Sequence, residues 1–184
     1  MTIAELHGKL SASSQNGAFE RMEDLLTSDV FGTMKYVSWQ NGFIDWLLKS
    51  EPAPIYSDIP LIQNYLVKAE IKSFEYSFWP RLKNNREPDL AICVVNKDST
   101  ILIVMIEAKY FSGMNDWDDD GLAGSLGLSG NQIADQIAGL HSISNDELNK
   151  WFPNLNKMGL LLSNTIIQKI HLLVTMHFCL PEYV

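Results

Sequence analysis

The pattern of apolar and polar positions changes period along the chain, and each change separates helical from extended segments. Apolar residues recur at helical spacing over 19–30. Ser28 is predicted to cap a second helical piece that continues to Val37. Segments 40–49 and 61–69 repeat the helical period. The N-terminal third is therefore predicted to be mostly helical.

The period shortens to two after this helical part, and three β-strands are predicted in succession. Segment 73–79 alternates aromatic with mostly polar side chains. Segments 88–95 and 101–109 are apolar and rich in β-branched residues, and the polar residues 96–99 between them predict a turn. The run over 101–109 is nearly continuous, which is typical of a central strand that is buried on both faces.

The C-terminal part returns to the helical period and then becomes extended again. Residues 112–130 are rich in Gly, Ser and Asp and predict a loop. A helix is predicted over 131–143, followed by a short helix that Asn145 caps, and then by a strand over 170–178. This order of helix, three strands, helix and strand predicts an α/β or α+β sheet fold.

The composition fits one globular domain that spans 1–184. The chain is 46% hydrophobic and 10% aromatic, which is enough to build a substantial core. Its apolar runs are too short to cross a bilayer and its start lacks a signal-peptide pattern, so we expect a soluble, cytoplasmic protein. Cys93 and Cys179 each lie in an apolar stretch and are expected to be buried free thiols.

Three charged residues lie at the ends of the two apolar strands. Glu107 and Lys109 are two positions apart in a strand, so they point to one face while Ala108 points to the other. If the two strands pair across the turn, Asp89 lies near the same end of the sheet. Two carboxylates and an ammonium group are then predicted to converge. The alternative interpretation is that they are solvated charges, with Glu107 and Lys109 as a simple ion pair.

This arrangement resembles the motif of the PD-(D/E)xK nuclease superfamily, which is present here as Pro88-Asp89 followed by Glu107-Ala108-Lys109. The resemblance implies a restriction-endonuclease-like αβββαβ core, with a four-stranded mixed sheet flanked by helices and an additional helical N-terminal part. It also implies metal-dependent hydrolysis of DNA, as in defence or phage-related processing. Such folds usually continue beyond the fourth core strand, so we expect either a truncated domain or one completed by oligomerisation or a protein partner.

The resemblance also implies a role for each residue of the motif. Asp89, Glu107 and the backbone carbonyl of Ala108 would hold one or two Mg²⁺ or Mn²⁺ ions, for which oxygen ligands are suited. Such an ion screens the phosphate charge and makes water easier to deprotonate. Lys109 would orient that water and stabilise the developing charge.

Members of the superfamily often add two auxiliary residues from helices. The first is an acid on the first helix, for which Glu23 in the segment 23–27 is our choice and Glu20 the alternative. The second is a glutamine on the helix after the third strand, for which Gln136 is our choice and Gln132 lies one turn away. For each of them the alternative is a place on the exposed face of an amphipathic helix.

The charge balance keeps a second class of function open. Lys and Arg total 14 against 22 Asp and Glu, and this net charge of -8 weighs against strong nonspecific DNA binding. Four of the acids, Asp116, Asp118, Asp119 and Asp120, are expected to form a solvated acidic loop. The second hypothesis is a catalytically inactive nuclease fold that acts as a nucleic-acid-binding or regulatory partner. The sequence contains no Gly-x-Ser-x-Gly elbow, phosphate-binding glycine loop or zinc motif that would favour another hydrolase class.

Overall fold

Helices and strands follow one another in the order of a mixed α/β fold. The structure is a computed structural model that describes residues 2–9, 18–50, 62–109, 131–160 and 167–175. Its elements are α1 (Ile3–Leu6), α2 (Ala18–Met34), the π-helical η1 (Gln40–Ile44), α3 (Asp45–Leu48), the 3₁₀ turns η3 (Ile62–Asn64) and η4 (Lys68–Glu70), β1 (Ile71–Phe78), β2 (Leu90–Asn96), β3 (Ile101–Lys109), α4 (Gln132–His141), α5 (Asn145–Trp151), α6 (Pro153–Lys157) and β4 (Ile167–Thr175).

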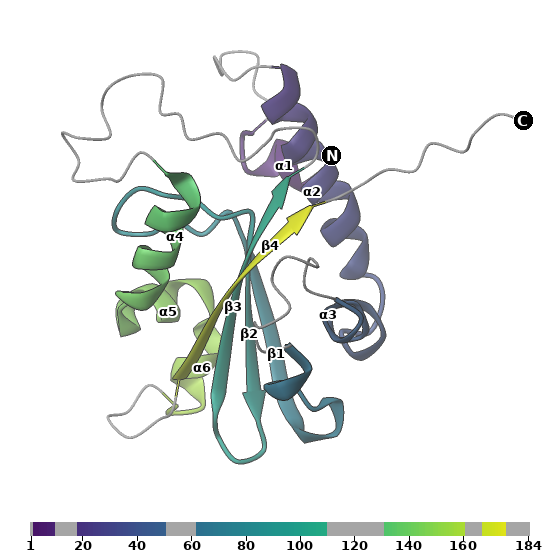
Figure 1. The fold of residues 1–184 in the computed structure, drawn as a ribbon. Helices are drawn as coiled ribbons and strands as arrows, with labels where there is room; N and C mark the ends of the chain where they lie inside the picture. The colour runs from purple at the N-terminus through teal and green to yellow at the C-terminus, as the bar shows by residue number, and fades with distance from the viewer. Residues whose placement is uncertain (1, 10–17, 51–61, 110–130, 161–166, 176–184) are drawn as a thin grey trace, which may run out of the picture.

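Strands β1, β2 and β3 form an antiparallel meander (Figure 1). Phe78 pairs with Leu90, and Leu90 pairs in turn with Ile106. The N–H of Asn96 donates to the carbonyl of Thr100 over 2.9 Å and closes the predicted turn between β2 and β3. Strand β4 lies parallel to β3 at the end of the order β1-β2-β3-β4. The mixed α/β class and the three consecutive antiparallel strands are thus confirmed.

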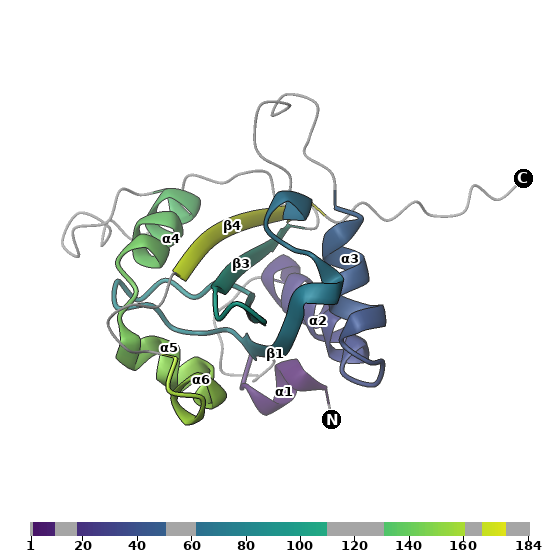
Figure 2. The same ribbon diagram turned by 90° about the horizontal axis from the view of Figure 1, so that it is seen from below.

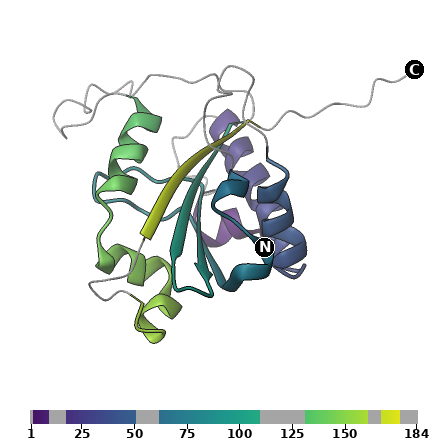
Figure 3. The same ribbon diagram turned by 60° about the horizontal axis from the view of Figure 1, so that its bottom comes forward.

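Helices cover both faces of the sheet (Figure 2). One face packs Leu90, Ile92, Val94, Leu102, Val104 and Ile106 against Phe31, Phe43, Ile44 and Leu47 of α2, η1 and α3. The opposite face packs Ala91, Cys93, Val95, Ile101, Ile103 and Met105 against Leu140 of α4, Leu148 and Trp151 of α5, Phe152, and Leu155 of α6. Figure 3 shows α4 on one side of β3 and β4 and α2 on the other. Side chains alternate along a strand, so Glu107 shares the α4 side with Ile103 and Met105.

Ser28 begins no second helix, which corrects the sequence prediction. Helix α2 runs without a break through this position, and Ser28 is buried inside the fold. Its hydroxyl oxygen accepts a hydrogen bond from the N–H of Ala4 over 3.1 Å. The first N–H groups of a helix have no partner within it, so Ser28 satisfies a donor of α1 instead of capping its own helix.

The helix predicted over 61–69 is also wrong where the structure describes it, since only the turns η3 and η4 form there. Gln63 donates through its side chain to the carbonyls of Leu48 and Ser50 at 2.7 and 3.2 Å, which ties this segment to the end of α3. Ile62 and Leu66 are nevertheless buried in the core. The apolar spacing therefore reflects burial of a tethered connection and not a helical period.

The short helix α5 forms as predicted, but its cap is Ser144 and not Asn145. Three predictions cannot be compared, because the loop 112–130 with its acids, Cys179 and the end of the predicted strand at 176–178 lie outside the described residues. Among the helices that the structure describes, none combines the length and the apolar character that crossing a bilayer requires.

Cys93 is a free, buried thiol on β2, as predicted. Burial raises the pKa of this thiol, and the nearby charge of Glu75 raises it further. Because the thiolate is the reactive form, the thiol should be inert in the folded protein.

We expect a Cys179→Ser variant, in which Cys93 is the remaining cysteine, to leave Ellman's reagent unreacted at pH 8. The same variant should react completely once urea unfolds it. Absorbance at 412 nm follows both reactions, and rapid labelling of the folded variant would contradict the burial of Cys93.

Candidate functional site

Asp89 is a buried carboxylate that directly precedes β2. Its Oδ2 atom accepts a hydrogen bond from the backbone N–H of Ala108 over 2.7 Å, across the gap to β3. Its Oδ1 atom accepts from the indole Nε1–H of Trp79 over 3.3 Å. The structure thus brings Asp89 to the segment that carries the Glu-x-Lys motif.

Glu107 lies near the end of β3 and is only 2% exposed. Its two carboxylate oxygens accept separate hydrogen bonds, one from Nε2 of Gln132 at 2.9 Å and one from Nε2 of Gln136 at 2.8 Å. Both donors come from α4, which covers this face of the sheet. The two glutamines that we considered as alternatives therefore act together, and Gln136 is fully buried instead of solvated.

The two acids occupy matching places at one end of the sheet. Leu90 pairs with Ile106, so Asp89 and Glu107 are the next residues along their two strands. Both are buried, which excludes the interpretation that they are solvated charges. Burying a carboxylate costs free energy unless hydrogen bonds compensate, and donors are present on each of the four carboxylate oxygens.

The other predicted site residues lie on β3 and α2. Lys109 is the last residue of β3 and pairs with Thr175 in the parallel register, while its side chain lies outside the described part of the chain. Glu23 is half-buried on α2, in the layer that covers the face opposite α4. The side chain of Glu20 also lies outside the described part.

Trp79 is a site residue that the sequence pattern does not reveal. Strand alternation would place it with Glu75 and Ser77, but its φ of 44° moves the backbone into the left-handed region. Its ring instead belongs to the apolar cluster on the α2 side of the sheet. The centroid of the ring lies 5.2 Å from the centroid of the His7 ring. A bulky residue at positive φ costs of order 1–3 kcal/mol, so the surrounding contacts must hold this strained conformation.

The donor set suits a hard divalent cation. Carboxylate oxygens favour Mg²⁺ or Mn²⁺, and Mg²⁺ is commonly held by only one or two carboxylates together with water. A carboxylate oxygen carries two lone pairs, so it can in general accept a hydrogen bond and also bind a cation. Within the described residues, no group of three His, Cys, Asp or Glu side chains is placed to hold a metal ion.

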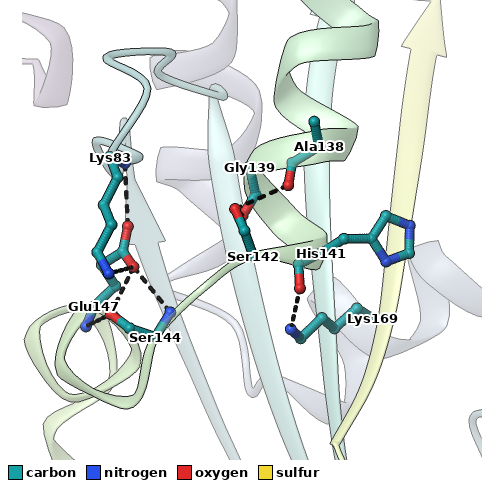
Figure 4. Close-up of polar contacts among 8 residues, drawn as sticks. All are labelled: Lys83, Ala138, Gly139, His141, Ser142, Ser144, Glu147 and Lys169. Atoms are coloured by element: carbon teal, nitrogen blue, oxygen red, sulfur yellow. Dashed lines mark hydrogen bonds and ion pairs between the residues drawn. The ribbon is translucent and has the colours of Figure 1, made fainter.

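Helix α4, which supplies both glutamines, is fixed at its C-terminal end (Figure 4). The Ser142 hydroxyl donates to the carbonyl of Ala138 over 3.0 Å, and Nζ of Lys169 on β4 donates to the carbonyl of His141 over 3.0 Å. Burial lowers the pKa of Lys169, although the charge of Glu147 acts in the opposite direction. The bond from Lys169 satisfies a carbonyl at the helix end, whereas the carbonyl of Ala138 also accepts the backbone N–H of Ser142 at 3.1 Å.

A second group of hydrogen bonds lies close to the first, at the start of α5 (Figure 4). Oε2 of Glu147 accepts from the N–H and the hydroxyl of Ser144 at 2.9 and 2.7 Å, and Oε1 accepts from the N–H of Lys83 at 3.1 Å. Burial alone would raise the pKa of Glu147, but the bonds from Ser144 and the charge and N–H of Lys83 together lower it. Glu147 thus joins the β1–β2 connection to the turn after α4.

Comparisons of the chain with protein-family models, with curated proteins and with solved structures find no match. The nuclease hypothesis consequently depends on the geometry around Asp89 and Glu107.

We expect Gln136→Leu to lower the free energy of unfolding by about 1–3 kcal/mol, because one oxygen of the buried Glu107 carboxylate loses its donor. The Glu107→Leu/Gln136→Leu double variant should regain much of this loss, since neither polar partner then remains buried. Urea unfolding at pH 7 measures both. Ala138→Leu, at an exposed position of the same helix, is the control. An equal loss of stability in that variant would contradict the expectation.

We expect Glu147→Gln to lower the free energy of unfolding by about 0.5–1 kcal/mol at neutral pH. The pKa of Glu147 is lower in the folded than in the unfolded chain, so the contribution of its charge is complete above the ordinary value of 4.5. It is lost as the pH falls through the lower folded value, and the native chain and the variant should then converge.

Urea unfolding in a series of buffers from neutral to acidic pH checks this convergence. Asp146→Asn, in the exposed first turn of the same helix, separates the general effect of the helix dipole from the bonds of Glu147. A difference between native chain and Glu147→Gln that stays constant over the whole series would contradict the role of the charge.

Proposed function

We propose that this chain is a metal-dependent nuclease that hydrolyses phosphodiester bonds of DNA, with Asp89 and Glu107 at the centre of its site. The observation that supports this most directly is the burial of both carboxylates at matching ends of neighbouring strands. Interior carboxylates are costly and gather where chemistry requires them. Apolar residues at these two positions would serve the core better.

The arrangement of elements around the pair also supports the proposal. Helices, three antiparallel strands, the helices α4 to α6 and a parallel strand follow each other, an order that can contain the αβββαβ core of the PD-(D/E)xK superfamily with its four-stranded mixed sheet. Gln136 stands on the helix after the third strand, where many members carry a glutamine, and it binds the motif glutamate Glu107. We therefore propose this core for the chain.

Each residue of the site is assigned a task. Asp89, Glu107 and the Ala108 carbonyl would hold Mg²⁺ or Mn²⁺, and such an ion, when bound, screens the phosphate and makes water easier to deprotonate. Gln132 and Gln136 orient Glu107 through their two hydrogen bonds. Lys109 would position the attacking water and stabilise charge on the phosphate. Glu23 would serve as the acid of the first helix.

One observation favours a second candidate, an inactive nuclease fold that binds nucleic acid or a protein partner. All four oxygens of Asp89 and Glu107 accept hydrogen bonds from protein groups, so the network is satisfied without an ion. The net charge of -8 weighs against nonspecific DNA binding and so favours a protein partner within this candidate. In that case Asp89 and Glu107 would fix the ends of the strands and nothing more.

We expect the purified chain to cut plasmid, linear double-stranded or single-stranded DNA with Mg²⁺ or Mn²⁺ and to stop with EDTA. Asp89→Asn, Glu107→Gln and Lys109→Ala should each reduce cutting by about 10²-fold or more, as for other groups that act at a reacting centre. Agarose gels follow cutting, and circular dichroism verifies the fold of each variant.

Asp146→Asn, exposed on α5, is the matched control and should cut normally. Gel-shift assays with and without Mn²⁺ separate binding from cutting. A folded chain that cuts no substrate with either metal would refute the nuclease and leave the binding protein as the better account.

A further inference from the structure

The connection between β1 and β2 is fastened to α4 by a buried ion pair. Nε and Nη2 of Arg86 donate to Oδ2 of Asp135 at 3.1 and 2.7 Å, and the two side chains are 14% and 7% exposed. Nδ2 of Asn84 adds a hydrogen bond of 2.7 Å to the backbone carbonyl of Asp135. Charge and backbone contacts thus meet at one residue of the helix.

Close packing holds the same connection one turn further along α4. A Cβ atom on Gly139 would lie 2.8 Å from Cδ1 of Leu82, which is closer than real Cβ contacts come, and 3.3 Å from Nδ2 of Asn84, which is closer than most of them. The connection is also closed on itself, because the N–H of Leu82 donates to the carbonyl of Arg86 over 2.9 Å. Arg86 therefore projects from a compact turn that rests directly on the helix.

The position of this fastening links the two acids of the site. Asp135 precedes Gln136 and follows Gln132 by three residues, so it lies within the same turns of α4 as the donors to Glu107. The connection that carries Arg86 leads straight into Asp89. One ion pair therefore joins the segment before Asp89 to the helix that orients Glu107.

We propose that Arg86 and Asp135 are a positioning pair, which sets the orientation of Gln132 and Gln136 and thereby of the Glu107 carboxylate relative to Asp89. Its consequence for metal binding rests on the proposed function. A buried ion pair adds little net stability compared with an apolar pair, but it fixes geometry. The planar fork of Arg86 binds one carboxylate oxygen through two nitrogens, and groups that orient metal ligands typically change metal affinity 10–100-fold when they are lost.

The first measurement is independent of metal and of cutting. In ¹⁵N NMR spectra the side-chain NH₂ groups of Gln132 and Gln136, assigned by Gln→Asn substitution, should exchange slowly in the native chain. Arg86→Gln should accelerate this exchange about tenfold or more, and Arg86→Lys, which keeps the charge, should be intermediate. Leu148→Ala is the control, because it weakens the same layer of the core without touching the pair.

Arg86→Gln leaves the Asp135 carboxylate buried without its cation, so the variant risks unfolding. The Arg86→Gln/Asp135→Asn double variant removes both charges together and provides a second test in a chain without that penalty. Circular dichroism establishes that each variant folds. Exchange of the glutamine NH₂ groups that remains native in a folded double variant overturns the positioning pair.

The second measurement is the affinity for Mn²⁺ by calorimetry in the absence of DNA. The double variant should bind Mn²⁺ about 10–100-fold more weakly than the native chain, while Leu148→Ala should bind with native affinity. Equal weakening in both variants would show a merely structural role and overturn the proposal. If the native chain binds no Mn²⁺, the proposed function fails, and the glutamine exchange rates alone then decide whether Arg86 and Asp135 position these side chains.

Discussion

The burial of the Glu107 carboxylate constrains the architecture around it. A carboxylate that is 2% exposed must receive hydrogen bonds. The donors come from α4, so this helix must lie over the sheet with Gln132 and Gln136 facing inward. The anchors of α4 at its two ends, on the β1–β2 connection and on β4, follow from that requirement. Hydrogen bonds to Glu107 thus contribute, together with apolar packing, to the placement of α4 on the sheet.

The alternation of side chains along β2 and β3 divides the molecule into two cores with different tasks. Leu90, Val104 and Ile106 face α2 and α3, and that layer is built almost wholly from apolar and aromatic groups. The opposite layer is apolar towards α5 and α6 but becomes polar where α4 meets Glu107. Asp89 stands at the border, since its two oxygens accept from Trp79 of the first layer and from the backbone of Ala108. The candidate site therefore lies where the sheet ends and the two layers meet.

The parts that the sequence could predict are those that depend on neighbouring residues. The alternation in β1, the apolar runs of β2 and β3 and the period of α4 predicted these elements, and the pairing of two strands across a short turn placed Asp89 beside Ala108. The errors depend on distant partners. The Ser28 hydroxyl accepts a hydrogen bond from an N–H of α1, and the Gln63 side chain donates to a carbonyl at the end of α3. Contacts from other segments hold the left-handed backbone of Trp79. The two residues of the Arg86–Asp135 pair are 49 positions apart in the sequence, so no local pattern predicts their contact.

The charges of the β1–β2 connection bear on how such an acidic chain would meet DNA. Its basic residues are already engaged, because Arg86 binds Asp135, Lys83 lies 3.7 Å from Glu147 and Arg81 lies 3.9 Å from Glu87. Phosphate binding depends on cations that are available to replace counterions, and these three are partly neutralised by their own carboxylates. On the nuclease hypothesis, a divalent ion between Asp89 and Glu107 would supply positive charge for a polyanion that this connection does not offer. On the nuclease hypothesis, binding and cutting would therefore share one requirement, whereas a metal-independent partner would have to recognise a different surface.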